Sequence, residues 1–184
     1  MNILILLGSA RKEGACARMA RALLSRLPQG EGTSVNIVNM YENTPQPCVG
    51  CGACSKRDVC RFDDMDGLWR QIEQSDVLII ASPVYFRGLP APMKALIDRM
   101  QRPYMAKKRG EALKGVQERR VVVLLASGTR CEDGSVVEAE LKYVLPLLSE
   151  KPYIMVQAKG TDYSDELSEE TLCELDKLAQ LIAD

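Results

Sequence analysis

Short apolar runs alternate with helix-like segments along the whole 184-residue chain. A parallel connection between strands has to cross back over the sheet, so a strand–helix alternation is typical of a parallel sheet with helices on both faces. The sequence therefore predicts an α/β fold of one domain. The predicted strands are residues 2–7, 34–39, 76–81, 120–126 and 153–157, and the predicted helices are residues 15–27, 64–74, 90–101, 135–148 and 167–183.

Composition excludes several function classes. Lys and Arg number 24 against 25 Asp and Glu, without the basic excess that is typical of nucleic-acid-binding proteins. The chain has no histidine, which excludes Ser-His and Cys-His nucleophile pairs and histidine-ligated metal sites. No apolar run approaches the length of a membrane span, and no basic segment precedes the first run as in a signal peptide. We therefore expect a cytoplasmic protein that binds neither membranes nor nucleic acid.

A polar loop at residues 8–16 joins the first strand to the first helix. The free N–H groups and positive dipole end of a helix favour an anion. Gly8 and Gly14 let the backbone approach a phosphate, while Ser9 adds a hydroxyl and Arg11 adds charge. The loop matches neither the NTPase phosphate loop nor the dinucleotide fingerprint. It predicts a phosphate site, with a plain glycine-bearing turn as the alternative.

A second loop, residues 82–90, follows the third predicted strand. Aromatic residues make up only 5% of the chain, yet Tyr85 and Phe86 are adjacent here. Open α/β sheets bind ligands at the carboxyl ends of their strands, and aromatic side chains pack well against a flat ring. The loop therefore predicts a site for a planar ligand; the alternative is that Tyr85 and Phe86 cap the core.

These motifs together resemble the NADPH-dependent FMN reductase branch of the flavodoxin-like proteins. The resemblance rests on Gly8-Ser9-Ala10-Arg11, on residues 82–86, and on Lys94, Asp98 and Arg99, and it covers roughly residues 1–130. It implies a three-layer sandwich with a five-stranded parallel sheet in order 2-1-3-4-5. FMN is then expected where the strand order reverses, between the first and third strands.

The resemblance also implies which residues hold FMN. Cys16 departs from the family, which usually has a threonine there, and a thiol is a weaker donor than a hydroxyl. One phosphate contact is therefore in doubt. The resemblance assigns the phosphate to Ser9, Arg11 and the backbone of Gly14, Ala15 and Cys16, one side of the isoalloxazine to Pro83, Val84, Tyr85 and Phe86, and the other side to Ser127, Gly128, Thr129 and Arg130.

A third loop, residues 40–63, contains Cys48, Cys51, Cys54 and Cys60. Two-residue gaps let successive thiolates converge, and the spacing resembles the bacterial ferredoxin run. The wider gap before Cys60 lets it return to the same cluster. The spacing predicts these four cysteines as ligands of a [4Fe-4S] cluster; an empty loop, zinc, or redox-disulfide chemistry are the alternatives.

The cysteine motif after the second strand is also similar to the iron–sulfur flavoproteins within this branch. All three loops follow strands, so we expect the cluster near the flavin at one edge of the sheet. By resemblance, the cluster faces the flavin of a neighbouring subunit in a homodimer or homotetramer.

Other charged and sulfur-containing residues have simpler interpretations. The basic segment 102–119 predicts a solvated surface excursion, and a weaker hypothesis makes it a docking site for an acidic partner. Lys94, Asp98 and Arg99 are spaced for an ion network on a helix surface. Cys131 and Cys173 are expected to be small packing residues. Core positions are expected at Met93, Leu96, Met100 and Leu175.

The predicted function is an FMN-dependent oxidoreductase resembling NAD(P)H:flavin or quinone reductases. The flavin carries the chemistry, so no catalytic side chain is predicted. Electrons would come from NAD(P)H or a ferredoxin-like donor, pass between the [4Fe-4S] cluster and FMN, and reach a small-molecule or protein acceptor. The alternatives are a flavodoxin-like electron carrier without turnover, an FMN reductase with an empty cysteine loop, and a zinc-stabilised interaction module.

Overall fold

The computed structural model is a three-layer α/β sandwich with a five-stranded parallel sheet in the order β2-β1-β3-β4-β5. It describes residues 1–28, 30, 32–114, 116, 118–129, 134–164 and 166–183. The fold class and the strand order predicted from the sequence are confirmed. The strands are β1 Asn2–Leu7, β2 Ser34–Asn39, β3 Val77–Pro83, β4 Arg120–Ala126 and β5 Ile154–Ala158.

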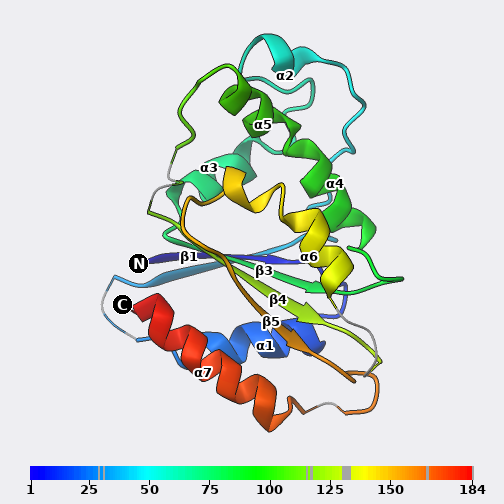
Figure 1. Ribbon diagram of the computed structural model, residues 1–184, viewed down its shortest axis with the longest axis vertical. Coiled ribbons are helices and arrows are strands. Elements are labelled where there is room, and N and C mark those ends of the chain that lie inside the picture. Colours follow the sequence, from blue (N-terminus) through cyan, green and yellow to red (C-terminus); the bar gives the residue numbers. More distant parts are fainter. Residues whose placement is uncertain are drawn as a thin grey trace.

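Helices cover both faces of the sheet (Figure 1). One face packs against α1 and α7, and the other against α3, α4 and α6 (Figure 1). The three central strands are buried almost throughout, as their continuous apolar sequence requires. The helices are α1 Ala15–Leu24, α2 Ala53–Lys56, α3 Asp66–Gln74, α4 Ala91–Arg99, α5 Gln101–Lys108, α6 Ser135–Leu141, η1 Leu145–Leu147 (a 3₁₀ turn) and α7 Glu169–Ala183.

Several helix predictions need correction. The predicted helix 135–148 ends at Leu141, and the shorter η1 turn contains Pro146, whose ring cannot continue an α-helix. The basic segment, which the charge pattern predicts to be a solvated surface excursion, begins with a helix: its first part forms α5, with Pro103 tolerated in the first turn. Within the cysteine segment, α2 is a single helical turn.

The predicted core positions Met93, Leu96, Met100 and Leu175 are buried, as expected. The prediction for Cys173 is wrong, because this thiol is exposed on α7. Cys131 lies outside the described residues. None of the described helices combines the length and apolar character needed to cross a membrane.

The ion network predicted on α4 is only half correct. Lys94 pairs with Asp98 one turn away on the exposed surface. Arg99, however, is 3% exposed and turns inward. Its guanidinium is surrounded by acceptors from the cysteine segment, which the helical spacing alone did not indicate.

Candidate functional site

The loop after β1 forms an open anion-binding turn at the start of α1. The Gly14 N–H donates to the Arg11 carbonyl (3.1 Å), and the Arg11 N–H donates to Ser9 Oγ (3.2 Å). A Cβ on Gly14 would stand 3.0 Å from Arg11 Cβ, so a larger residue would crowd this close turn. Within the described chain, no side chain caps α1 and no acidic group pairs with the Arg11 guanidinium. The helix dipole, its unpaired first N–H groups and Arg11 therefore all favour an incoming anion.

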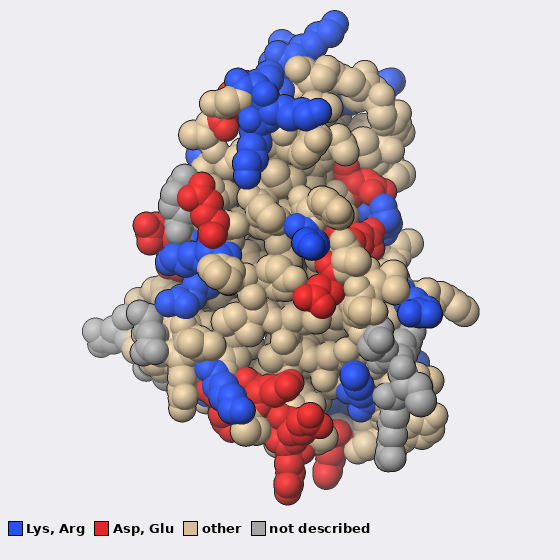
Figure 2. All heavy atoms as spheres, viewed as in Figure 1, with Lys and Arg blue, Asp and Glu red and all other residues tan. Residues whose placement is uncertain are grey.

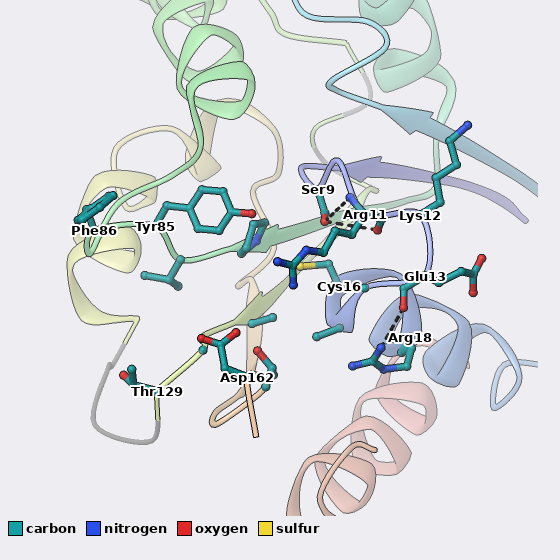
Figure 3. Close-up of a pocket in the computed structure, with 17 residues that line it drawn as sticks. Ser9, Arg11, Lys12, Glu13, Cys16, Arg18, Tyr85, Phe86, Thr129 and Asp162 are labelled. Carbon is teal, nitrogen blue, oxygen red and sulfur yellow. Dashed lines mark hydrogen bonds between the residues drawn. The ribbon is translucent and has the colours of Figure 1, made fainter. Parts of the chain in front are cut away.

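The loop after β3 forms an aromatic wall beside this turn. Val84 is buried, whereas Tyr85 is 46% exposed and Phe86 is fully exposed. Tyr85 and Gly88 exchange two backbone hydrogen bonds of 2.9 Å, and the residues between them, Phe86 and Arg87, have positive φ angles of 49° and 64°. This geometry is costly for residues other than glycine. The turn holds Phe86 outward at the pocket mouth instead of in the core (Figure 3).

The third wall comes from the loops after β4 and β5. The Thr161 N–H donates to the Ser127 carbonyl (3.0 Å), and the Asp162 N–H donates to the Gly128 carbonyl (3.2 Å). These bonds tie the two loops together at the carboxyl edge of the sheet. Ser127 itself is fully buried, and its Oγ accepts a hydrogen bond from Gln157 Nε2 (3.1 Å).

The three walls enclose one pocket of about 700 Å³. This volume is in the range of small-molecule and cofactor sites. Arg130, one of the predicted flavin-binding residues, lies outside the described residues. Of the others, every residue except Ser127 lines this pocket. Figure 3 shows the arrangement of the pocket residues. The lining residues are Ser9, Arg11, Lys12, Glu13, Gly14, Ala15, Cys16, Arg18, Pro83, Val84, Tyr85, Phe86, Ala126, Gly128, Thr129, Thr161 and Asp162.

Sequence reasoning missed the contribution of the loop after β5. Thr161 and Asp162 line the pocket, although the single Gly160 and Tyr163 that flank them form no recognised motif. Their only sequence indication is position, directly after the fifth strand, where parallel-sheet ligands bind. Arg18 was also missed, because it lies one turn inside α1.

Cys16 stands in the first turn of α1 and lines the pocket, but only 2% of it is exposed. Burial raises the pKa of its thiol to about 12, with its own backbone N–H and the Arg18 charge acting in the opposite direction. The thiol is therefore protonated at neutral pH. It is a weak hydrogen-bond donor toward this pocket and a poor nucleophile.

The four cysteines of the 40–63 segment line a second pocket of about 180 Å³. Its other walls are largely apolar and include Phe62 and Met105. Gly50 and Gly52 adopt left-handed φ angles of 63° and 73°, which lets the chain turn tightly between thiols. The pKa of the Cys54 thiol is raised, first by burial and then by the nearby thiols of Cys48, Cys60 and Cys51.

The second pocket does not lie beside the first at the sheet edge, where the order of loops and strands predicts it. It shares no lining residue with the first pocket. In Figure 1, α2 packs on α5 beyond the helix layer, away from the strand ends. The segment begins at the carboxyl end of β2 but is long enough to leave the sheet edge. Its starting point therefore does not predict where its cysteines lie.

Arginines of α4 and α5 hold the cysteine segment in this position. Arg99 donates to the carbonyls of Gln46 (2.8 Å) and Phe62 (3.1 Å), and it pairs with Asp64 (2.9 Å). Burial acts to raise the pKa of Asp64, but hydrogen bonds from Arg99 and the Gln46 N–H outweigh it, so this pKa lies below its usual value.

Two arginines of the basic segment have the same role. Arg102 binds both carboxylate oxygens of Asp58 (2.7 and 3.2 Å), and Arg109 donates to the Cys54 carbonyl. The interpretation of the whole segment as a solvated excursion is therefore wrong for these two residues. Lys107 and Lys108 remain exposed on α5, and Lys56 and Arg57 are exposed at the end of α2, which packs on α5. Figure 2 shows basic side chains gathered at this end, while acidic side chains gather at the opposite end, where α7 lies.

Sequence comparison finds two kinds of relative. The chain is 39% identical over 118 residues to an iron–sulfur flavoprotein of Archaeoglobus fulgidus, covering 61% of this chain and 53% of the relative. It is 36% identical over 100 residues to an iron–sulfur flavoprotein of Methanosarcina thermophila, covering 54% and 52%. The chain thus aligns with about half the length of these relatives. It is also 27% identical to an FMN-dependent NADH:quinone oxidoreductase of Jannaschia sp., covering 80% of both chains.

Solved structures share the fold. An FMN-dependent NADH-azoreductase from Bacillus anthracis in complex with FMN superposes with a TM-score of 0.74 at 17% identity, covering 100% of this chain and 99% of that one. An NAD(P)H:quinone oxidoreductase from Methanothermobacter marburgensis gives a TM-score of 0.67 at 16% identity, covering 100% and 95%. Residues 1–155 match the family described as NADPH-dependent FMN reductase. The chain therefore belongs to the NADPH-dependent FMN reductase family.

Proposed function

We propose that this chain binds FMN in the pocket at the sheet edge and works as an NAD(P)H-dependent flavin oxidoreductase. One observation carries the proposal: a single pocket joins an uncapped helix N-terminus and Arg11 to an apolar and aromatic wall at Pro83–Phe86. FMN has the matching polarity, with a phosphate at one end and a flat ring system at the other. Residues 1–184 act in this proposal as one FMN-binding domain in the cytoplasm.

Different residues bind the two ends of FMN in this proposal. Ser9, Arg11 and the N–H groups at Gly14–Cys16 bind the phosphate. Pro83, Val84 and Tyr85 provide one wall for the ring, and Gly128 provides the other. When bound, FMN supplies the redox chemistry. Histidine is therefore not required, and the protein's contribution is binding, orientation and electrostatics.

The first experiment is a titration of the apoprotein with FMN and with riboflavin, followed by NADH and NADPH oxidation assays with a flavin or quinone acceptor. We expect FMN to bind more tightly than riboflavin, because only FMN carries the phosphate. Steady NAD(P)H oxidation by the FMN-loaded protein supports the oxidoreductase. FMN binding without turnover supports the electron carrier, and failure to bind FMN contradicts both.

We also propose that Cys48, Cys51, Cys54 and Cys60 hold a [4Fe-4S] cluster. Their thiols are free and line one pocket. Their spacing along one short segment resembles the ligand run of bacterial ferredoxins. The names of the iron–sulfur flavoprotein relatives support the same choice.

Anaerobic purification with iron, sulfide and zinc analysis tests the cluster. We expect about four irons and four sulfides per chain for a [4Fe-4S] cluster. A Cys51→Ser variant is expected to lose iron, whereas the matched Cys173→Ser variant, altered at an exposed thiol on α7, keeps it. Zinc without iron contradicts the cluster, and a metal-free, FMN-loaded protein leaves an FMN reductase with an empty cysteine loop.

The basic end of the molecule supports an acidic protein as electron donor. Lys56, Arg57, Lys107 and Lys108 are exposed beside the cysteine pocket. Complementary charge would speed encounter with a ferredoxin-like donor and make the rate salt-dependent. Lys107→Glu with Lys108→Glu is expected to slow reduction by an acidic ferredoxin at low salt. The control, Lys177→Glu, changes a lysine on α7 and should not slow it. An unchanged rate in the double variant contradicts this docking surface.

The cysteine pocket lies away from the flavin pocket of its own chain, which favours assembly as a homodimer or homotetramer with the cluster facing a neighbouring flavin. Sedimentation of the loaded protein tests this assembly. A monomer that still transfers electrons between cluster and flavin would contradict it.

A further inference from the structure

The loop after β5 carries an acidic side chain into the proposed flavin pocket. Backbone hydrogen bonds from Thr161 to Ser127 and from Asp162 to Gly128 hold this loop against the end of β4. Figure 3 shows the Asp162 carboxylate pointing into the pocket, with Arg11 on another wall. The carboxylate therefore has a defined position, although it belongs to an exposed loop.

Gly128 shows how closely this carboxylate packs. A Cβ built on Gly128 would overlap Asp162 Oδ2 and lie 2.6 Å from its Cγ. The carboxylate thus lies directly on the Gly128 backbone, and any side chain at residue 128 would displace it. Glycine at this position serves the placement of Asp162, because its φ angle needs no special freedom.

The carboxylate has no protein counter-ion in the part of the chain that the structure describes. None of the ion pairs there includes Asp162, and its side chain accepts no hydrogen bond from a described residue. Most other carboxylates around the two pockets, such as Glu13, Asp58 and Asp64, are paired with arginines. An unpaired carboxylate on a cofactor pocket is available to a donor of the bound molecule.

Strand order separates the Asp162 carboxylate from the anion-binding turn that would hold the phosphate. The anion-binding turn follows β1, whereas Gly128 follows β4, and β3 lies between these two strands. Two strand spacings amount to roughly 10 Å. Two anions side by side would also repel each other. The carboxylate therefore faces the ribityl chain or the ring, whose hydroxyl and imide groups are hydrogen-bond donors.

We propose that Asp162 is a positioning residue that accepts a hydrogen bond from an O–H or N–H group of FMN and sets the flavin's reduction potential. This inference rests on the proposed FMN site. A fixed negative charge near the ring opposes the negative charge that the flavin gains on reduction. Asp162 therefore stabilises oxidised FMN relative to reduced FMN, and keeps the bound flavin a stronger reductant.

The test compares Asp162→Asn, Asp162→Glu and the wild-type chain, each reconstituted with FMN. Oxidised FMN is expected to bind ~5-fold more weakly to Asp162→Asn, because a charge-assisted bond becomes a neutral one. Its midpoint potential should rise by about 30 mV, which corresponds to a tenfold change in the ratio of oxidised to reduced affinities. Asp162→Glu keeps the charge and should lie closer to the wild type. Glu150→Gln, which removes a negative charge outside the pocket, should change neither quantity.

Lumiflavin, which lacks the ribityl chain, shows whether Asp162 accepts its hydrogen bond from the ring or from the ribityl chain. Weaker binding of lumiflavin to Asp162→Asn assigns the bond to the ring, whereas a loss seen only with riboflavin and FMN assigns it to the ribityl chain. Wild-type affinity and potential in Asp162→Asn overturn the inference while leaving the FMN site intact. Failure of the wild type to bind FMN overturns the proposed function itself, and the inference with it.

Discussion

Two pockets of this protein, the proposed flavin pocket and the cysteine pocket, are built in opposite ways. The flavin pocket gathers residues from Ser9 to Asp162, which the ends of four parallel strands bring to one edge. The cysteine pocket gathers four thiols from a single segment, which arginines of α4 and α5 hold in place. Backbone topology therefore positions the first pocket, and charged side chains position the second. The two should respond differently to loss of a charge and to pH.

The largest expected effect is that of Arg99→Ala. Removing a 3%-exposed guanidinium leaves two carbonyls without this donor and Asp64 without its cationic partner, which should cost about 3 kcal/mol of unfolding free energy. Urea unfolding measures the cost, and hydrogen exchange should show lost protection in residues 44–63. FMN affinity should stay within about twofold, because the sheet edge is intact.

Arg99→Lys is the control for charge, because it keeps the cation but cannot bind several acceptors as a planar fork. It should recover only part of the stability. If Arg99→Ala weakens FMN binding as strongly as it exposes the cysteine segment, the two pockets are coupled and are not positioned independently.

The next effect concerns the flavin pocket. Arg11→Ala removes a charge-assisted hydrogen bond and should weaken FMN binding ~10- to 100-fold, with a smaller effect at high salt. Riboflavin affinity should not change, since riboflavin has no phosphate. Lys12→Ala is the matched control, because Lys12 already pairs with Glu42 at 2.7 Å and should contribute little. An equal loss for riboflavin would show that Arg11 contacts another part of the ligand.

A pH-dependent effect follows from Cys16. Its pKa is raised from 9.0 to about 12 in the folded chain, so above pH 9 the unfolded chain releases a proton that the folded chain retains. Stability should therefore fall between pH 9 and 12, by about 1 kcal/mol at pH 10. Cys16→Ser removes this titration. Urea unfolding at pH 8 and pH 10 should show a smaller loss in the variant, and equal losses would contradict the buried, protonated thiol.

The smallest expected effect is at the surface of the cysteine segment. Asp58→Asn breaks a bidentate pair with Arg102, but Asp58 is 52% exposed, so the cost should be below about 1 kcal/mol and should shrink with salt. Its pKa is lowered mainly by the hydrogen bond from Arg102, so the contribution is present above about pH 4 and is lost as the pH falls further. Asp176→Asn, which breaks an exposed pair with Arg26, gives the scale for comparison. A loss of stability in Asp58→Asn as large as that in Arg99→Ala would contradict the expectation that an exposed ion pair contributes less than the buried Arg99.

Much of this architecture followed from local sequence pattern. Five runs specified the five strands, of which the three central ones are buried almost throughout and the edge strand β2 is largely exposed, and their alternation with helices required parallel pairing. The glycine turn before α1 and the aromatic turn after β3 indicated the pocket, because parallel strands end at one edge. Local spacing also grouped the four cysteines correctly, since they come from one short segment.

Contacts between distant residues could not be predicted in this way. The spacing of Arg99 from Lys94 and Asp98 suggested a surface network, yet its partners Gln46 and Phe62 lie 53 and 37 residues away. The position of Asp162 could not be predicted for the same reason, because its contact with Gly128 depends on how the loops after β4 and β5 pack together.

The sequence by itself determined the layers of the fold, the strand alternation, the two loops that form the phosphate and aromatic walls of the proposed flavin pocket, and the grouping of the four cysteines. Periodicity and short-range spacing carry this information, because they decide which faces are buried and which residues share a loop. Only the tertiary structure decided that the cysteine pocket leaves the sheet edge, that Arg99 turns inward and that Asp162 enters the flavin pocket. Each of these depends on charge pairing or packing between segments far apart in the chain, which no local pattern specifies.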